Sequence, residues 1–299
     1  CVHAAMAAPY HPADAERAAR HALRVSPADP DAHVALGDAL ISAYQLSAAG
    51  ASYRRALALD PMHGAAYLGW GEIARETDES EPALARFKLA SRYMREPLLA
   101  WVFLGVAQRE SGLVREAVHS LQTATRIAPT GPEFHWQLAD AQEAAGARLD
   151  ALRSCSTAIG LLPTHVEAYA SLARIAAYEA RSSRQASLAR WAFRTALRLH
   201  PTQPVTLHNL GEFLEAQGDS RRAVLSFGRA VAAAPANFLH RLSLGENLQR
   251  QCRVREVAPR AHISRHLPQS PTASASARTS SASAACARWR PEPTSPAIS

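Results

Sequence analysis

The chain has 299 residues, of which 47% are hydrophobic and 6% aromatic, and its formal net charge is +7. This length holds one or two ordinary domains, and no apolar run reaches the roughly 18 residues of a membrane-spanning helix, so we expect no membrane partner. The four cysteines (Cys1, Cys155, Cys252 and Cys286) are too far apart for a zinc pair or a redox CxxC motif and too few for a disulfide scaffold.

The positive charge is concentrated at the C-terminal end. Residues 250–299 contain eight arginines and two acidic residues, a net +6, which leaves +1 for the rest of the chain. Binding to a phosphate backbone requires basic residues clustered on a folded face. We therefore expect no nucleic-acid partner.

Alanine recurs at an interval of 34 residues along most of the chain. The first series is Ala15, Ala49, Ala83, Ala117 and Ala151, then Ala189 after 38 residues and Ala223 after 34. The second series lies seven residues further on, which is two turns along the same helix face: Ala22, Ala56, Ala90, Ala124, Ala158, Ala196 and Ala230. A proline, which stops a helix, follows five residues after each of these except Ala90, where Arg95 stands.

A second helix in each unit is indicated upstream of the alanine pair, where a large apolar residue precedes a small one. These pairs are Leu36-Gly37, Trp70-Gly71, Leu104-Gly105, Leu138-Ala139, Leu172-Ala173, Leu210-Gly211 and Leu244-Gly245. Each unit is thus predicted to be two antiparallel helices that cross closely at the small residues. Larger side chains are expected to fill the space between them: Tyr53, Phe87, Leu121, Phe193 and Phe227.

The turn between the two helices of a unit also has a recurring signal. Gly112, Gly146 and Gly218 stand at equivalent positions, where a left-handed residue ends a helix. In one unit, residues 77–82 are instead predicted to use a capping side chain, with Pro82 in the next helix's first turn. Four extra residues fall between Tyr178 and Ala189, at an exposed turn.

This pattern resembles the tetratricopeptide repeat family, over about residues 12 to 250. Six full units are predicted, at 30–63, 64–97, 98–131, 132–165, 166–203 and 204–237. The resemblance implies an all-α fold, a right-handed superhelical solenoid of stacked antiparallel helix pairs.

The two ends depart from the repeat. Residues 1–11 are expected to be a disordered or clipped N-terminus, and 12–29 the second helix of a truncated first repeat. Residues 238–250 are predicted to form the first helix of a further unit, and 251–267 a degenerate helix. From 268 to 299 proline, serine, alanine and arginine dominate, which predicts a disordered tail. An out-of-frame end also fits that composition, and the chain is expected to be a fragment of a bacterial protein.

In this family the first helix of each unit lines a concave groove, through its fifth and ninth residues. Five of the seven ninth positions are acidic here. The candidate groove residues for protein binding are Asp38, Glu72, Arg109, Trp136, Asp140, Arg174, His208, Glu212 and Glu246.

These residues suit a peptide that carries lysine or arginine and an apolar anchor, with Trp136 as an exposed aromatic. We expect Asp140 and Glu212 to face solvent. The alternative is that the acidic residues only solvate the inner face and pair with Arg75, Arg109 and Arg174.

Two other groove chemistries of the family are not matched. A clamp for a terminal carboxylate uses lysine, asparagine and arginine, whereas the ninth positions here are mainly acidic. An asparagine ladder of the type found in sugar-transferring enzymes needs asparagine at the sixth positions, and only Asn209 provides one.

No enzyme motif such as GxGxxG, GxxxxGK[ST], GxSxG or HExxH occurs, and the histidines lack ligand spacing. We therefore predict no catalytic, cofactor-binding or metal-ligating residue. His33, His135, Trp70, Trp101 and Trp191 are interpreted as packing residues, and Cys155 as a small buried hydrophobe.

The sequence favours a non-catalytic scaffold that binds a peptide segment in the concave groove, with no cofactor. The alternative is the N-terminal recruiting arm of a larger enzyme, such as a glycosyltransferase, sulfotransferase or methyltransferase. A third hypothesis is end-to-end assembly of uncapped units. The identity of the protein partner and the oligomeric state stay open, and a cytoplasmic location is the default expectation.

Overall fold

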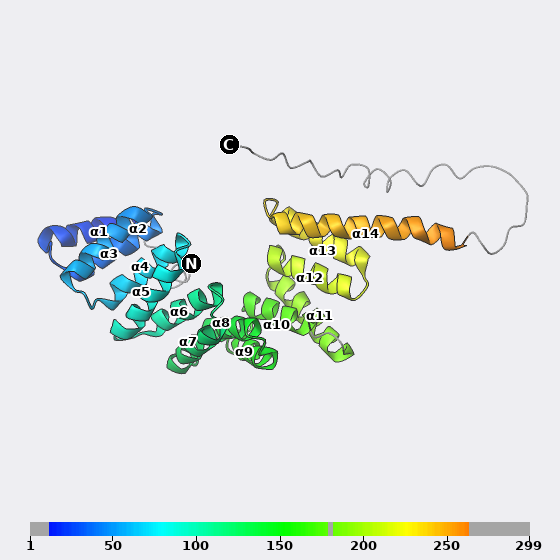
Figure 1. Ribbon diagram of the computed structural model, residues 1–299, viewed down its shortest axis with the longest axis horizontal. Helices are drawn as coiled ribbons and strands as arrows, with labels where there is room; N and C mark the ends of the chain where they lie inside the picture. Colours follow the sequence, from blue (N-terminus) through cyan, green and yellow to red (C-terminus); the bar gives the residue numbers. More distant parts are fainter. Residues whose placement is uncertain (1–11, 179–181, 263–299) are drawn as a thin grey trace, which may run out of the picture. The chain divides into compact units, whose positions relative to one another are not determined.

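The computed structural model describes residues 12–178 and 182–262, and all fourteen regular elements in these ranges are helices (Figure 1). The predicted N-terminal segment 1–11 and tail 268–299 lie outside the described residues. So do residues 179–181, in the stretch where the four-residue insertion is predicted, and 263–267 of the predicted degenerate helix.

The chain divides into two compact units between Ile175 and Ala176. The first unit contains α1 (Pro12–Val25), α2 (Pro30–Ser42), α3 (Leu46–Leu59), α4 (Gly64–Glu76), α5 (Ser80–Tyr93), α6 (Leu98–Glu110), α7 (Val114–Ile127), α8 (Pro132–Ala144), α9 (Arg148–Leu161) and most of α10 (Val166–Tyr178). The second contains α11 (Ser183–Leu199), α12 (Pro204–Ala216), α13 (Ser220–Ala233) and α14 (Phe238–His262).

Within each of the two compact units, consecutive helices pack as antiparallel pairs, one pair for each repeat (Figure 1). In the first unit α2 packs on α3, α4 on α5, α6 on α7 and α8 on α9, and in the second α12 packs on α13. Successive pairs stack because α3 also contacts α4, α5 contacts α6 and α7 contacts α8. The first helices α2, α4, α6 and α8 consequently neighbour one another and line one face of the stack.

The predicted small-residue crossings form the core. Ala49, Ala117 and Ala151 are fully buried, and the large side chains Tyr53 and Phe87 beside them are buried as completely. Because the helices cross so closely, only small residues fit on the first helix opposite these rings. This confirms the predicted all-α fold of stacked helix pairs.

The turns between paired helices use a left-handed residue, as predicted. Gly112, Gly146 and Gly218 have φ of 78° and close the first helix of their unit. Asp78 (φ 62°) and Tyr44 (φ 58°) occupy the same position in two other units. Tyr44 is the unusual member, since a bulky side chain is disfavoured in this conformation.

Of the prediction for residues 77–82, the proline is confirmed, since Pro82 lies in the first turn of α5, but the side-chain cap before that helix is wrong. Glu79, the residue that precedes α5, makes no capping hydrogen bond with its side chain. The hydroxyl of Thr77 donates instead to the carbonyl oxygens of Ile73 and Ala74, at 3.1 and 3.2 Å. With Asp78 left-handed, this unit turns in the same way as the others.

The C-terminal helix differs from the predicted division at residue 250. α14 runs without a break from Phe238 to His262, where two helices were expected. No glycine or proline stands between residues 246 and 258, so nothing in the backbone chemistry ends the helix at 250.

The tryptophans and histidines that were predicted to pack in the core are buried to different degrees. Trp191 is 49% exposed, so the prediction that it lies in the core is wrong, whereas Trp70 and Trp101 are partly buried against the core. His33 and His135 are half-buried, and their Nε2 atoms lie 3.2 and 2.9 Å from the carbonyl oxygens of Pro27 and Pro129. These hydrogen bonds connect α2 and α8, the first helices of their repeats, to the turns that precede them.

Candidate functional site

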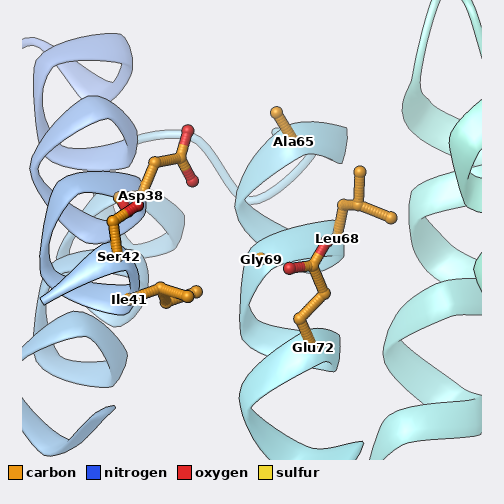
Figure 2. A pocket seen from close by; sticks show the side chains of 7 residues that line it. All are labelled: Asp38, Ile41, Ser42, Ala65, Leu68, Gly69 and Glu72. Atoms are coloured by element: carbon orange, nitrogen blue, oxygen red, sulfur yellow. The ribbon is translucent and has the colours of Figure 1, made fainter. Parts of the chain in front are cut away.

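The pocket that contains two of the predicted groove residues lies between the neighbouring first helices α2 and α4 (Figure 2). Its volume is about 80 Å³. α2 contributes Asp38, Ile41 and Ser42, and α4 contributes Ala65, Leu68, Gly69 and Glu72. Two carboxylates therefore share a small pocket with the apolar side chains of Ile41 and Leu68.

Tyr53 of α3 connects this pocket to the core. Its ring is fully buried, and its hydroxyl donates a hydrogen bond to Oδ1 of Asp38 at 2.6 Å. The ring fits because two glycines flank it: a Cβ atom on Gly37 would lie 2.6 Å from the ring, and one on Gly69 2.3 Å. The sequence predicted Tyr53 only as a space-filling residue, and its hydroxyl was the overlooked signal.

The protonation state of Tyr53 is fixed by its surroundings. Burial raises the pKa of the Tyr53 hydroxyl far above its usual range, and the negative charges of Asp38 and Glu72 raise it further. The hydroxyl therefore stays a donor at any physiological pH. It holds the Asp38 carboxylate in one orientation at the wall of the pocket.

The central acidic residue, Asp140 of α8, has a different environment. Its Oδ1 lies 3.0 Å from Nη2 of Arg174 and accepts from the hydroxyl of Ser171 at 2.9 Å, while its Oδ2 lies 4.0 Å from Nη1 of Arg109. Its side chain is only 13% exposed, so the expectation that Asp140 faces solvent is wrong. Here the arrangement matches the alternative, in which acidic residues pair with arginines of neighbouring first helices.

This ion-pair network extends along the same face of the first unit. Arg174 also pairs with Glu143 at 2.5 Å, and Arg75 of α4 lies 3.8 Å from Glu110 of α6. Burial raises the pKa of the Glu143 carboxyl, an effect that the charge of Arg174 opposes. The face therefore carries internally paired charges around α6, α8 and α10.

Trp136 is held in place rather than exposed. Its indole Nε1 donates to the hydroxyl of Ser171 at 3.1 Å, and its ring centroid lies 5.7 Å from that of His165. His165 is itself fixed, because Nδ1 accepts from the backbone N–H of Ala168 at 3.2 Å and Nε2 lies 3.2 Å from Glu133. The expectation of an exposed aromatic anchor at this position is wrong.

The remaining predicted groove residues belong to the second unit. Nε2 of His208 on α12 lies 3.4 Å from Glu212, whose side chain is 63% exposed and so faces solvent as expected. Glu246 on α14 is exposed as well. The neighbouring Glu215 forms an ion pair with Arg250.

Within 12–178 and 182–262, no group of three or more histidine, cysteine, aspartate or glutamate side chains could hold a metal ion. No helix in this part of the chain has both the length and the apolar character needed to cross a bilayer.

The fold defines a class of protein, a repeat protein in which antiparallel helix pairs stack and one helix of each pair lines a common face. The same fold occurs in solved structures of tetratricopeptide repeat proteins, to which this chain is similar. No family model matches the chain, and no curated protein matches it either.

Three solved structures illustrate the likeness. A chain of the APC/C hetero-tetramer Cut9–Hcn1 superposes with a TM-score of 0.67 at 16% identity; the match covers 80% of this chain but only 46% of that longer one. A tetratricopeptide repeat protein from Parabacteroides merdae gives 0.62 at 17% identity, over 79% of this chain and 92% of that one. YrrB, a TPR protein with an unusual peptide-binding site, gives 0.54 at 23% identity, over 65% and 98%.

Proposed function

We propose that this protein is a non-catalytic scaffold for protein–protein interaction, and that it binds a peptide segment of its partner along the face lined by the first helices. The observation that carries the proposal is the pocket between α2 and α4, in which Asp38 and Glu72 stand beside Ile41 and Leu68. The likeness to YrrB, described as having a peptide-binding site, is consistent with it.

The chemistry of the pocket favours a lysine or arginine side chain of the partner. Two carboxylates attract a cationic head group, and the apolar side chains of Ile41 and Leu68 suit its aliphatic stem. The hydrogen bond from Tyr53 fixes Asp38 before binding, which reduces the ordering cost on association. A nucleic-acid phosphate would be repelled by the same carboxylates.

The other groove residues take different parts in this proposal. Asp140, Arg109 and Arg174 are already engaged with one another, so they shape the face and contribute little to anchoring. Glu212 and Glu246 are exposed on the second unit, and the α2–α4 anchor does not depend on them.

The proposal is tested by selecting peptides from a random phage-displayed library on the full chain and measuring their affinity by fluorescence anisotropy. Selected peptides should be enriched in lysine or arginine next to an apolar residue. Asp38→Asn and Glu72→Gln remove one charge each at nearly constant shape, and together they should weaken binding about tenfold or more.

The matched control is Glu116→Gln, which removes an exposed carboxylate from the second helix α7 and should leave the affinity unchanged. A selection without basic residues, or an affinity that the double substitution leaves intact, would rule out the α2–α4 pocket as the anchor. Unfolding of the variants is checked by circular dichroism.

A further inference from the structure

The last described helix, α14, buries polar residues at two positions where the other first helices bury apolar ones, apart from Thr206 of α12. His240 and Asn247 are only 4% and 2% exposed. The residues at the position of His240 in the earlier units are Ala32, Ala66, Ala100, Phe134, Ala168 and Thr206, and at the position of Asn247 they are Ala39, Ile73, Ala107, Ala141, Ile175 and Phe213, all of them buried. Two core positions through which α14 packs on the rest of the repeat are therefore occupied by polar side chains.

The buried polar atoms on this face lack hydrogen-bond partners. Neither ring nitrogen of His240 has one, and the same holds for Oδ1 of Asn247 and for Nδ1 of His208 on α12. The ring centroids of His208 and His240 are 4.9 Å apart. Unsatisfied buried polar groups destabilise the state that buries them, so they weaken the docking of α14.

The charged groups around His240 do not compensate a positive charge on its ring. From α12 it faces His208, whose own Nε2 lies 3.4 Å from Glu212. α13 contributes the ring of Phe227, 5.4 Å from the His208 centroid, and its Arg229 donates to the carbonyl oxygen of Pro201. On α14 itself the neighbouring Arg241 is exposed to solvent.

We propose that the docking of α14 onto α12 and α13 is a pH-sensitive switch, in which protonation of His240 in mild acid releases the helix. The two imidazole rings form the sensor, since a cation at His240 would be buried beside a second ionisable ring. Release of α14 would carry away Glu246, a groove position, and the contact of Arg250 with Glu215.

The direction of the pH dependence follows from the environment of the docked ring. Burial, and then the charge of His208, lower the pKa of His240 below the ordinary value of 6.5. The docked helix consequently binds the proton less tightly than the released helix. The stability of docking is therefore fully present above about pH 6.5, and below it the docking equilibrium constant falls by at most about tenfold per pH unit for one proton.

Hydrogen exchange read by mass spectrometry on the full chain tests the switch. Protection of the backbone over residues 238–250 is compared at about pH 7.5 and about pH 5.5, after correction for the intrinsic pH dependence of exchange. We expect protection of this segment to fall several-fold, up to about tenfold, at the lower pH, while α7 in the first unit keeps its protection. Equal corrected protection at both values would overturn the proposal.

Two substitutions separate the switch from general instability. His240→Phe installs the residue type that stands at this position in α8, and His240→Ala the type found in α4 and α6. Both variants should keep α14 protected to the same degree at both pH values. His119→Ala, at an exposed histidine of α7, should retain the pH response of the wild type. A pH response that persists in both His240 variants would show that another group is the sensor.

Discussion

Gly71→Ala should destabilise the protein, although alanine is the better helix former. A Cβ atom at Gly71 of α4 would lie 2.6 Å from Cε1 and 2.7 Å from Cδ1 of Phe87. Phe87 is fully buried and stacks on Phe103 with centroids 5.6 Å apart, so its ring has no free space to enter. Overpacking costs about 1–3 kcal/mol, and the gain in helix propensity returns about 1 kcal/mol. The expected net loss is therefore up to about 2 kcal/mol.

Urea denaturation followed by circular dichroism measures this change, and Gly228→Ala is its control. Gly228 lies within α13, and a Cβ atom there would meet nothing within 4 Å. That substitution should therefore stabilise the protein, by up to about 1 kcal/mol. If both substitutions changed the free energy of unfolding in the same direction, the argument from close helix crossing would be refuted.

The chain already contains a compensated version of this crossing. Ala139 stands at the position of Gly71, and the residue opposite it is the small Cys155; both are fully buried. Phe87→Cys in the Gly71→Ala background should accordingly cost less than the sum of the two single changes. A coupling energy of about 0.5 kcal/mol or more, measured by the double-mutant cycle, is expected.

Two further predictions concern single positions. Tyr44→Gly should stabilise the protein by about 0.5–1 kcal/mol in the same urea assay. Tyr44 is 89% exposed, and its left-handed φ of 58° is one that glycine adopts without strain. Gly112→Ala, at φ 78°, should destabilise the protein for the same reason. Cys155 should resist iodoacetamide at about pH 8 until the protein is denatured, because burial raises the pKa of its thiol to about 12. Mass spectrometry of the peptide that contains Cys155 measures the labelling. Rapid labelling of the native chain would contradict the prediction.

The features that the sequence predicted correctly are those set by local spacing. The alanine series and the glycine turns recur at 34 residues, and each reflects one requirement of the helix pair: a close crossing or a left-handed residue. Such requirements are met by residue type alone. The burial of Phe87 and Cys155 could be predicted because their positions within the repeat already fix their surroundings.

The features that the sequence left open between two interpretations, or predicted wrongly, depend on contacts between neighbouring repeats. Asp140 and Trp136 occupy groove positions, but Arg174 and Ser171 of the next first helix lie close enough to engage both. Which charges pair is decided by the side-chain length and hydrogen-bonding groups of the neighbouring helix. The sequence pattern of one repeat contains no information on the side chains of the next repeat. The exposed acidic surface was therefore overestimated at Asp140.

The pocket at Asp38 shows how the core and the groove are linked. Tyr53, Phe87 and Phe227 fill the same core position in three units, but only tyrosine carries a hydroxyl that reaches the groove carboxylate of its own unit. Phe87 and Phe227 have nothing to donate to Glu72 and Glu212. A single oxygen atom on a core side chain thus gives Asp38 a fixed orientation that phenylalanine cannot provide. The specificity of such a groove is therefore encoded partly in the residues beneath it.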